Sequence, residues 1–256
     1  MTPSFRNCHE LNESIIRFRT PHQVEKGGQV NAVLAAKHAL RLGFDMSTQL
    51  TPEKALIFRI VHRDNFIEVV RDGCHCRSTK DGKKYVEIGN AELIEKRKGR
   101  EVPGPYGGTL SDYVPFYFTP YSPMLYNIKT GYNGVTKRPM SDILILVSSL
   151  HKLKEQNVPF MFSDRHAYLK TAEFSKNLGK LKDMIIWPVL QARNFRKDDV
   201  DRFEKYQAEA LVYKHVPLSA LIGVACCTTD VRNAAQELAD SRNAQLKIVT
   251  KPEWYL

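Results

Sequence analysis

The sequence predicts an α+β fold. Short apolar strands alternate with short helices and long loops, an arrangement that favours α+β over a doubly wound parallel sheet. The 256 residues are 43% hydrophobic. A chain of this length buries roughly 70–75% of its unfolded surface, so a packed core is expected. We find no internal repeat.

Residues 1–50 are interpreted as an N-terminal extension, separate from a domain over residues 51–256. Apolar residues recur at helical spacing within 29–41, which predicts a short helix there. The Ser/Thr-rich segment that begins at Met46 is typical of the start of a new domain. The alternative is that the extension packs on the domain as an ordinary pair of N-terminal helices.

Local patterns predict the first half of the domain. Residues 55–62 are apolar and β-branched, which favours a buried strand. Asp64 and Asn65 provide N-cap side chains for a helix over 66–71, and Gly73 ends it. Beyond a Lys- and Gly-rich loop, the pattern predicts a polar helix or turn at 91–98, an irregular loop at 102–108, a strand at 112–118 and a helix from Ser122.

The second half is predicted in the same way. Helical spacing favours helices at 167–178 and 231–240. Apolar runs favour strands at 143–148, 159–162, 207–213, 222–227 and 246–249. No apolar run approaches the length of about 18 residues that a membrane span needs, so no membrane partner is expected.

The charge balance indicates an anionic partner. Lys and Arg number 38 against 28 Asp and Glu, a net charge of +10. Such an excess points first to nucleic acid. The five cysteines are too few and too irregularly spaced for a disulfide framework, and no signal-like segment opens the sequence. We expect a cytoplasmic protein with reduced cysteines that acts as a monomer.

Common catalytic and phosphate-binding motifs do not occur in the sequence. The glycine-rich segment 104–108 is neither a Walker loop nor a dinucleotide fingerprint, because no Gly-Lys-Ser/Thr follows it and no strand precedes it at the right spacing. Gly-x-Ser-x-Gly is missing as well. Cys74, His75 and Cys76 lack a second ligand pair at zinc-finger spacing, so no metal is expected.

One carboxylate lies in an unusual place. Glu209 falls in the predicted strand 207–213, where alternate residues share a face. In a central strand its side chain would point into a pocket. There a carboxylate can accept a ribose hydroxyl and stabilise an oxocarbenium-like centre. In an edge strand it would face water, and the pattern alone leaves both interpretations open.

Arg59 raises a similar question, because it is a cation within the apolar run 56–61. Burying a guanidinium is costly unless an anion compensates for the lost hydration. A nucleotide phosphate or a carboxylate of the protein would satisfy Arg59 equally well.

A basic segment precedes an aromatic one. Lys96, Arg97, Lys98 and Arg100 supply charge that attracts phosphates. The rings between Tyr106 and Tyr121 supply surfaces on which bases can stack, although half of those in 113–118 must lie in the core. This combination suits single-stranded nucleic acid.

Four segments together resemble one protein family. They are Arg59-Ile-Val-His-Arg-Asp-Asn, the block from Gly107 to Tyr126, the block from Val158 to Tyr168, and Gln207-Ala-Glu-Ala-Leu-Val-Tyr. In this order and spacing they resemble the DarT family. DarT proteins are toxins of DarT–DarG toxin–antitoxin systems, and they transfer ADP-ribose from NAD onto a base of single-stranded DNA. The resemblance covers about residues 51–256, and its Tyr-Val-Pro-Phe-Tyr-Phe block is highly specific.

The resemblance implies an ADP-ribosyltransferase-like fold, similar to that of poly(ADP-ribose) polymerases. Two small antiparallel sheets would form an NAD cleft surrounded by helices. The family's catalytic glutamate falls on Glu209, and its catalytic substrate-loop arginine falls on Arg97. Arg59 departs from the histidine that holds NAD in many relatives, which leaves its contact open between the nicotinamide ribose and the pyrophosphate. The implied cofactor-binding residues are Arg59, Val61, His62, Asn65, Tyr117 and Met124; the implied DNA-binding residues are Lys96, Arg97, Lys98, Arg100, Arg165 and His166.

The chemistry of NAD agrees with these roles. Nicotinamide is attached to the ribose as a cationic ring and leaves as a neutral molecule, so no general acid is needed to expel it. The enzyme must instead hold the ribose, stabilise the oxocarbenium and present a base nitrogen. Glu209 suits the first two tasks, and Arg97 could polarise a base carbonyl. We expect thymidine of single-stranded DNA as acceptor, a block to DNA replication, no metal, and a DarG-like macrodomain antitoxin as partner. The alternatives are guanosine, RNA or protein as acceptor, and a non-catalytic protein that binds single-stranded nucleic acid.

Overall fold

A large mixed sheet organises residues 49–79 and 85–255, which the computed structural model describes. The strand order is β10-β9-β4-β1-β3-β7-β5-β6, and only the β10–β9 pair is parallel. The strands are β1 (Leu56–His62), β3 (Tyr113–Tyr117), β4 (Ile143–Ser149), β5 (Phe160–Ser163), β6 (Phe174–Ser175), β7 (Glu209–Tyr213), β9 (Gly223–Cys226) and β10 (Lys247–Thr250). A separate small sheet pairs β2 (Cys74–His75) with β8 (His215–Val216). The predicted α+β class is confirmed.

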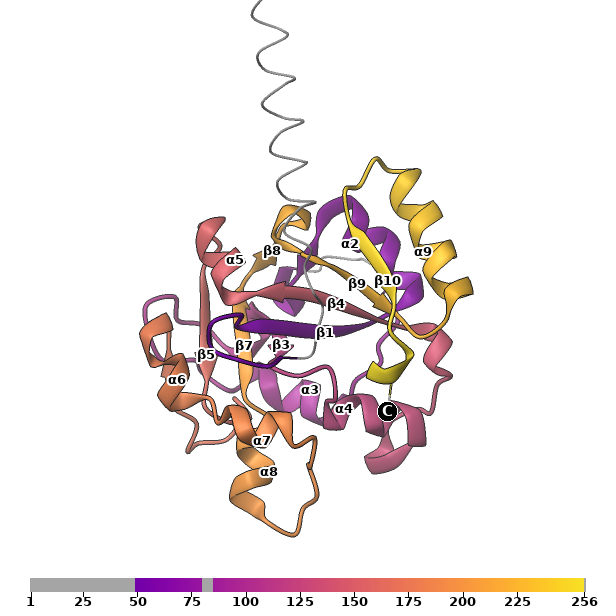
Figure 1. The fold of residues 1–256 in the computed structure, drawn as a ribbon. Helices are drawn as coiled ribbons and strands as arrows, with labels where there is room; N and C mark the ends of the chain where they lie inside the picture. The colour runs from indigo at the N-terminus through magenta and orange to yellow at the C-terminus, as the bar shows by residue number, and fades with distance from the viewer. Residues whose placement is uncertain (1–48, 80–84, 256) are drawn as a thin grey trace, which may run out of the picture. The chain divides into compact units, whose positions relative to one another are not determined.

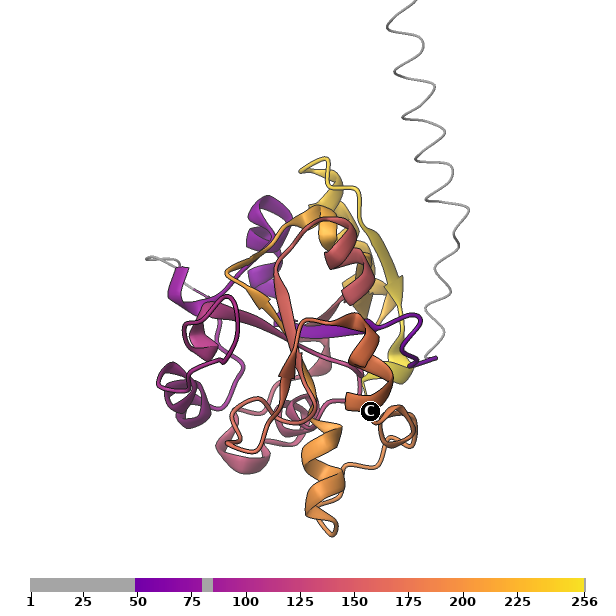
Figure 2. The same ribbon diagram turned by 90° about the vertical axis from the view of Figure 1, so that its left-hand side faces the viewer.

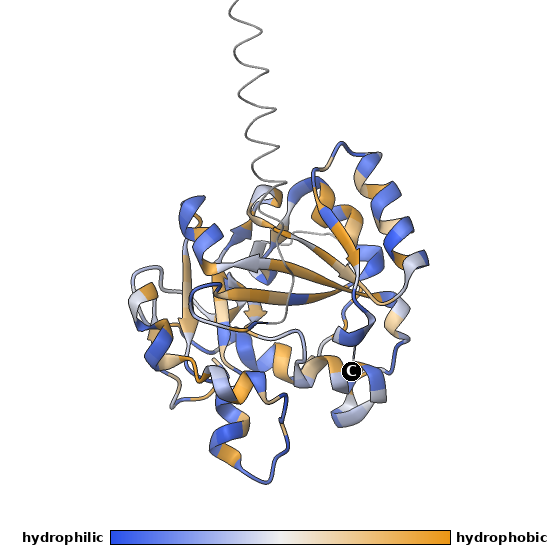
Figure 3. Ribbon diagram, in the orientation of Figure 1, coloured by the Kyte–Doolittle hydropathy of each residue, from blue (hydrophilic) through white to orange (hydrophobic). Residues whose placement is uncertain are grey.

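Short helices surround the main sheet. They are α2 (Phe66–Asp72), α3 (Ala91–Lys98), α4 (Pro123–Thr130), α5 (Leu150–Glu155), α6 (Leu181–Met184), α7 (Trp187–Gln191), α8 (Val200–Tyr206) and α9 (Thr229–Asp240). In both ribbon views α8 lies at the bottom of the domain and α9 on the opposite side, toward the top (Figures 1 and 2). The central strands are mainly hydrophobic and α9 carries many hydrophilic residues (Figure 3). The core therefore lies on the sheet, and every residue of β4 is buried.

A single residue pair joins the two halves of the main sheet. β1 pairs with β4 over seven residues, from Leu56↔Ser149 to His62↔Ile143, but with β3 only at Phe58↔Tyr117. In Figure 1, β1 and β4 run across the view, whereas β5 and β7 run down it. The halves β10-β9-β4-β1 and β3-β7-β5-β6 thus diverge from this joint. They take the place of the two small sheets expected from the resemblance, although they form one continuous sheet.

Pro115 explains why the joint is so short. The N–H and C=O of a strand residue point to the same neighbour, and proline has no N–H to donate. The carbonyl of Pro115 faces β1, where it accepts a hydrogen bond from Arg59 Nη1 at 2.8 Å. Pro115 therefore offers no donor on the side where the β1–β3 ladder would continue, and a side chain of β1 takes the place of that pairing.

Some local predictions are wrong. Residues 167–178 contain turns and β6 but no α-helix; a 3₁₀ helix begins only at Leu178. Of these residues only Ala167 is buried, so the helical spacing had no core to pack against. Asn65 does not cap α2 through its side chain; its amide instead forms two 2.9 Å hydrogen bonds with the backbone of Val86. The predicted end of α2 at Gly73, with φ of 75°, is confirmed.

Several expectations concern other properties of the chain. The predicted helix at 29–41 and Cys8 lie outside the described residues. Within the described part, four cysteines are free, and no cluster of three or more His, Cys, Asp or Glu side chains could hold a metal ion. None of the helices described is both long enough and apolar enough to cross a membrane.

Candidate active site

A pocket opens where the two halves of the sheet diverge. It has a volume of about 210 Å³, and we call it the central pocket. Arg59 of β1, Tyr117 of β3, Arg97 of α3 and Glu209 of β7 all line it. The separation of β1 from β3 accounts for the opening. Beyond the Phe58↔Tyr117 pair the backbones of the two strands are no longer hydrogen-bonded to each other, so their side chains are not held against one another.

Glu209 is the buried carboxylate of the central pocket. Its strand lies between β3 and β5, and its side chain is only 3% exposed. Arg97 donates from Nη1 to Oε1 at 3.0 Å and from Nη2 to Oε2 at 2.9 Å. The backbone N–H of Ala167 donates to Oε1 at 3.1 Å. The interpretation of Glu209 as a pocket residue is confirmed, and the edge-strand alternative is wrong.

The electrostatics keep this pair charged. Burial raises the pKa of Glu209, but the positive charge of Arg97 and the donated hydrogen bonds outweigh it, so the pKa lies below its usual value. Burial acts against the charge of Arg97, and the nearby carboxylate more than compensates, so the pKa of Arg97 is raised. A carboxylate has about four acceptor positions. Three are filled here, which leaves room for one further donor such as a ribose hydroxyl.

Tyr117 faces Glu209 across the β3–β7 ladder. Burial raises the pKa of its hydroxyl, and the negative charge of Glu209 raises it further, well above the usual tyrosine value. The hydroxyl therefore remains protonated at neutral pH. A protonated phenol beside the carboxylate can donate a hydrogen bond within the pocket.

The turn that follows β5 holds Glu209 from the other side. Ser163 Oγ accepts from the backbone N–H of Glu209 at 3.3 Å and donates to the carbonyl of Arg165 at 2.7 Å. His166 Nδ1 lies 3.7 Å from Glu209 Oε1 and accepts from Tyr168 N at 3.2 Å. Burial lowers the pKa of His166, although Glu209 opposes this shift. The imidazole is therefore neutral at pH 7, with its proton on Nε2.

Arg59 lies where the central pocket meets a smaller cavity. This side pocket has a volume of about 70 Å³ and is lined by Val61, His62 and Asn65. Arg59 donates a hydrogen bond to the carbonyl of Pro115. It forms no ion pair within 4 Å with any carboxylate of the described residues. A guanidinium has five N–H donors. The remaining donors of Arg59 are thus available to an anion in the pocket, and no protein carboxylate of the described part takes that place.

A third cavity adjoins the central pocket on its other side. We call it the outer groove; its volume is about 1420 Å³. It shares Asn90, Leu93, Tyr117, Met124 and His166 with the central pocket. Of the remaining cations predicted to bind DNA, Lys96 lines it. The Arg97–Glu209 pair therefore lies beside the place where two cavities meet.

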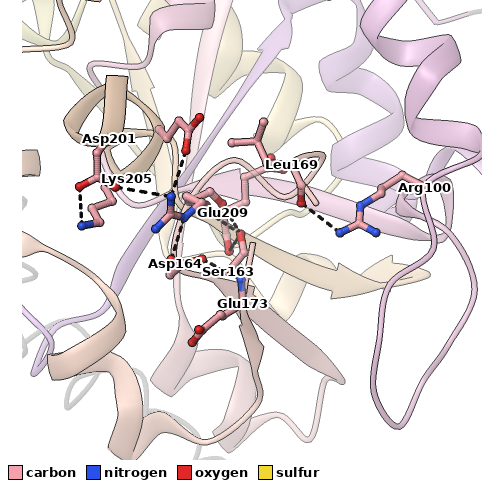
Figure 4. Close-up of polar contacts among 10 residues, drawn as sticks. Arg100, Ser163, Asp164, Leu169, Glu173, Asp201, Lys205 and Glu209 are labelled. Carbon is pink, nitrogen blue, oxygen red and sulfur yellow. Dashed lines mark hydrogen bonds and ion pairs between the residues drawn. The ribbon is translucent and has the colours of Figure 1, made fainter. Parts of the chain in front are cut away.

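The other predicted DNA-binding cations lie elsewhere. Lys98 and Arg165 are held in ion pairs with neighbouring carboxylates, and Arg100 donates to the carbonyl of Leu169 at 3.0 Å. Figure 4 shows the contact of Arg100 and the ion-pair network around Asp164 and Asp201. None of these three cations lines a pocket described above, so their assignment to DNA rests on the sequence alone.

Sequence reasoning missed three groups of the site. The backbone N–H of Ala167 and the hydroxyl of Ser163 hold Glu209 from the turn after β5. The carbonyl of Pro115 orients Arg59. Only Pro115 left a signal in the sequence, because a proline inside a strand pattern marks an interrupted ladder.

Comparison with known proteins identifies the family. A family model described as "DarT: ssDNA thymidine ADP-ribosyltransferase" matches residues 58–256. A DNA ADP-ribosyl transferase of Escherichia coli O127:H6 is 47% identical over 84% of this chain and 99% of its own length. One from Thermus sp. 2.9 is 35% identical over 80% and 97%.

Solved structures agree with the sequence comparisons. Thermus sp. 2.9 DarT in complex with ADP-ribosylated single-stranded DNA superposes with a TM-score of 0.75 at 32% identity, over 80% of this chain and 98% of the other. The same protein in complex with NAD⁺ gives a TM-score of 0.71 at 31% identity, over 80% and 99%. The chain therefore belongs to the DarT family of single-stranded DNA thymidine ADP-ribosyltransferases.

Proposed function

We propose that this enzyme transfers ADP-ribose from NAD to thymidine in single-stranded DNA and releases nicotinamide. The observation that carries the proposal is the buried Arg97–Glu209 pair beside the meeting point of two cavities. One cavity can then hold the donor and the other the acceptor. The relative from Thermus sp. 2.9 supports this division, since its structures contain NAD⁺ in one case and ADP-ribosylated single-stranded DNA in the other.

NAD fits the central pocket and the side pocket. Arg59 lies at their junction and offers unpaired donors to the pyrophosphate. Val61, His62 and Asn65 then line the part of the site that holds the adenosine half, while Tyr117 and Met124 lie beside the nicotinamide half. This placement brings the nicotinamide ribose to Glu209, whose remaining acceptor position takes a ribose hydroxyl.

The residues of the pocket divide the reaction between them. As the bond from C1′ to the nicotinamide nitrogen breaks, the negative charge of Glu209 stabilises the cationic ribose. Arg97 polarises a carbonyl of thymine, which makes the neighbouring N3 proton more acidic. N3 then forms the new bond to C1′, and its proton passes to the Glu209 acceptor position that the ribose hydroxyl vacates as the ribose moves to the base. Holding both partners in one site removes the entropy cost of their meeting.

Arg59→Ala is expected to raise KM for NAD by roughly 10- to 100-fold, because a hydrogen-bonded charge contributes about 1.5–3 kcal/mol. Steady-state kinetics with varied NAD and a fixed oligonucleotide measure the change. Arg59→Lys is the matched control, since it keeps the charge and loses the fork of donors. An unchanged KM in the alanine variant would show that Arg59 does not bind NAD and has only a structural role, through its hydrogen bond to Pro115.

The acceptor can be tested with oligonucleotides of one sequence. We expect transfer to the single strand and little transfer to the duplex, because base pairing hides thymine N3. Replacing each thymine in turn should abolish labelling at one position, and mass spectrometry of the released nucleosides identifies the base. Labelled guanosine, labelled RNA or equal labelling of the duplex would contradict the proposed acceptor while leaving the NAD chemistry intact.

The proposal also covers the enzyme's protein partner, its cellular location, its oligomeric state and the extent of its catalytic domain. An enzyme that blocks bases in DNA endangers its own host, so we propose a DarG-like macrodomain antitoxin that removes the ADP-ribose. DNA as substrate agrees with a cytoplasmic location, and we propose that the enzyme acts as a monomer. We further propose that residues 51–256 form the enzyme domain, because the matched family segment falls within them.

A further inference from the structure

The outer groove carries exposed rings that the proposed reaction does not use. Tyr126 of α4 and Tyr132 in the following turn are 42% and 52% exposed. Their ring centroids lie 6.4 Å apart, and the Phe195 ring lies 5.9 Å from that of Tyr126. All three rings line the groove. A cluster of exposed rings in a concave surface is a feature of binding sites.

Cations lie among these rings without carboxylate partners. Arg193, Arg196 and Lys197 line the groove, and none of them forms an ion pair with a carboxylate of the described residues. Lys197 Nζ lies 5.2 Å from the centroid of Tyr132. By contrast, Arg202 and Lys205 of the adjacent helix α8 are each paired with an aspartate. The free positive charge is thus concentrated beside the rings.

The outer groove carries a net positive charge. Its lining contains four cations, Lys96, Arg193, Arg196 and Lys197, against the single carboxylate of Glu92. Glu92 is engaged by Lys96 at 2.5 Å, which leaves the three cations of the segment 193–197 uncompensated. These three cations can bind phosphates, and the rings can stack on bases whatever their sequence.

We propose that the aromatic and basic wall formed by Tyr126, Tyr132, Phe195 and Lys197 binds the nucleotides that flank the modified thymidine. The inference rests on the proposed function, because it extends the acceptor strand from the reacting base into the outer groove. A volume of about 1420 Å³ exceeds the ~300–1,000 Å³ of a site for one small ligand. The groove also reaches the reacting centre at Tyr117, Met124 and His166. A strand bound there can therefore deliver one base to Arg97 and stack its neighbours on the wall.

Tyr132→Ala in the full-length protein tests the stacking. We expect KM for a ten-nucleotide DNA strand to rise about 10-fold, the loss associated with one stacked base, with kcat and KM for NAD within twofold of the unaltered enzyme. Tyr132→Phe keeps the ring and should retain the original KM. Thymidine 5′-monophosphate has no flanking nucleotide to place on the wall, so its KM as acceptor should not change. The side chain is half exposed, so the fold should be retained.

Lys197→Met tests the phosphate contact, with Lys176→Met as control because Lys176 is exposed and lies outside the groove. The slope of log Kd against log salt for a single strand should become shallower by about 0.7 in the first variant and stay unchanged in the second. Fluorescence anisotropy without NAD gives these constants independently of catalysis. If the native enzyme binds the strand in this way but transfers nothing, the proposed function fails and the groove assignment survives.

Other outcomes would overturn the inference. They are an unchanged KM in Tyr132→Ala, equal effects on thymidine 5′-monophosphate and on the ten-nucleotide strand, and equal salt slopes for the two lysine variants. Binding of an RNA strand about tenfold tighter than DNA of the same sequence would overturn the assignment of the groove to DNA.

Discussion

Glu209→Gln is expected to lower ADP-ribose transfer by about 10³-fold or more, the largest effect of any single change in the site. The amide keeps the size and one acceptor oxygen of the carboxylate but removes the negative charge that stabilises the cationic ribose. Labelled NAD and a single-stranded oligonucleotide measure the rate. Glu237→Gln, on the exposed side of α9, is the matched control and should retain full activity.

The same substitution should also lower stability. The Arg97 side chain is 14% exposed, and it loses the partner of a buried ion pair. Such a loss costs about 3–5 kcal/mol in the free energy of unfolding. Thermal unfolding measures it, and the double variant Glu209→Gln/Arg97→Met should recover stability without recovering activity. A Glu209→Gln enzyme that still transfers ADP-ribose at a tenth of the original rate would refute the proposed mechanism.

The pH dependence of stability follows from the lowered pKa of Glu209. Because its pKa is lower in the folded state than in the unfolded chain, the Glu209 carboxylate stabilises the fold above its usual pKa, and the contribution is lost as pH falls through the lowered value. Acid unfolding of Glu209→Gln should therefore depend less steeply on pH. Equal slopes for the two proteins would show that the pair does not control this transition.

Arg97→Ala is expected to reduce DNA modification by about 10²- to 10³-fold and hydrolysis of NAD much less. Arg97 lines the central pocket, where it contacts Glu209, and directly follows Lys96, which lines the outer groove, so we expect it to act mainly on the acceptor. Nicotinamide release with and without oligonucleotide separates the two reactions. Arg97→Lys should give an intermediate loss, since lysine keeps the charge but cannot form the bidentate contact.

The hydrolysis that remains in Arg97→Ala carries a second expected result. Without Arg97, burial is the main influence on Glu209, and its pKa should rise. The acid limb of the pH profile for NAD hydrolysis should therefore move to higher pH. Equal losses of hydrolysis and DNA modification, with no movement of this limb, would place Arg97 in the NAD site instead.

The sequence alone determined the strands of four or more residues, the α+β class and the candidate glutamate. Period-two alternation around Glu209 and the apolar run around Arg59 are local signals, and strands follow from such signals because neighbouring side chains decide which face is buried. The segment 167–178 shows the limit of this reasoning. Its spacing favoured a helix, but Ala167 donates to Glu209, and His166 just before the segment donates to the carbonyl of Glu204; both partners come later in the sequence.

Only the tertiary structure decided how the site is assembled. Arg97 and Glu209 lie 112 residues apart in the sequence, and their contact depends on how α3 and β7 are brought together by the rest of the chain. The tertiary structure also decided which cations remain available. Arg165 is neutralised by carboxylates of α8, whereas the cations of 193–197 line the outer groove with no carboxylate partner among the described residues. The sequence sets the charge of each residue, but its partners are fixed by distances between side chains, which arise only when separate segments pack against one another.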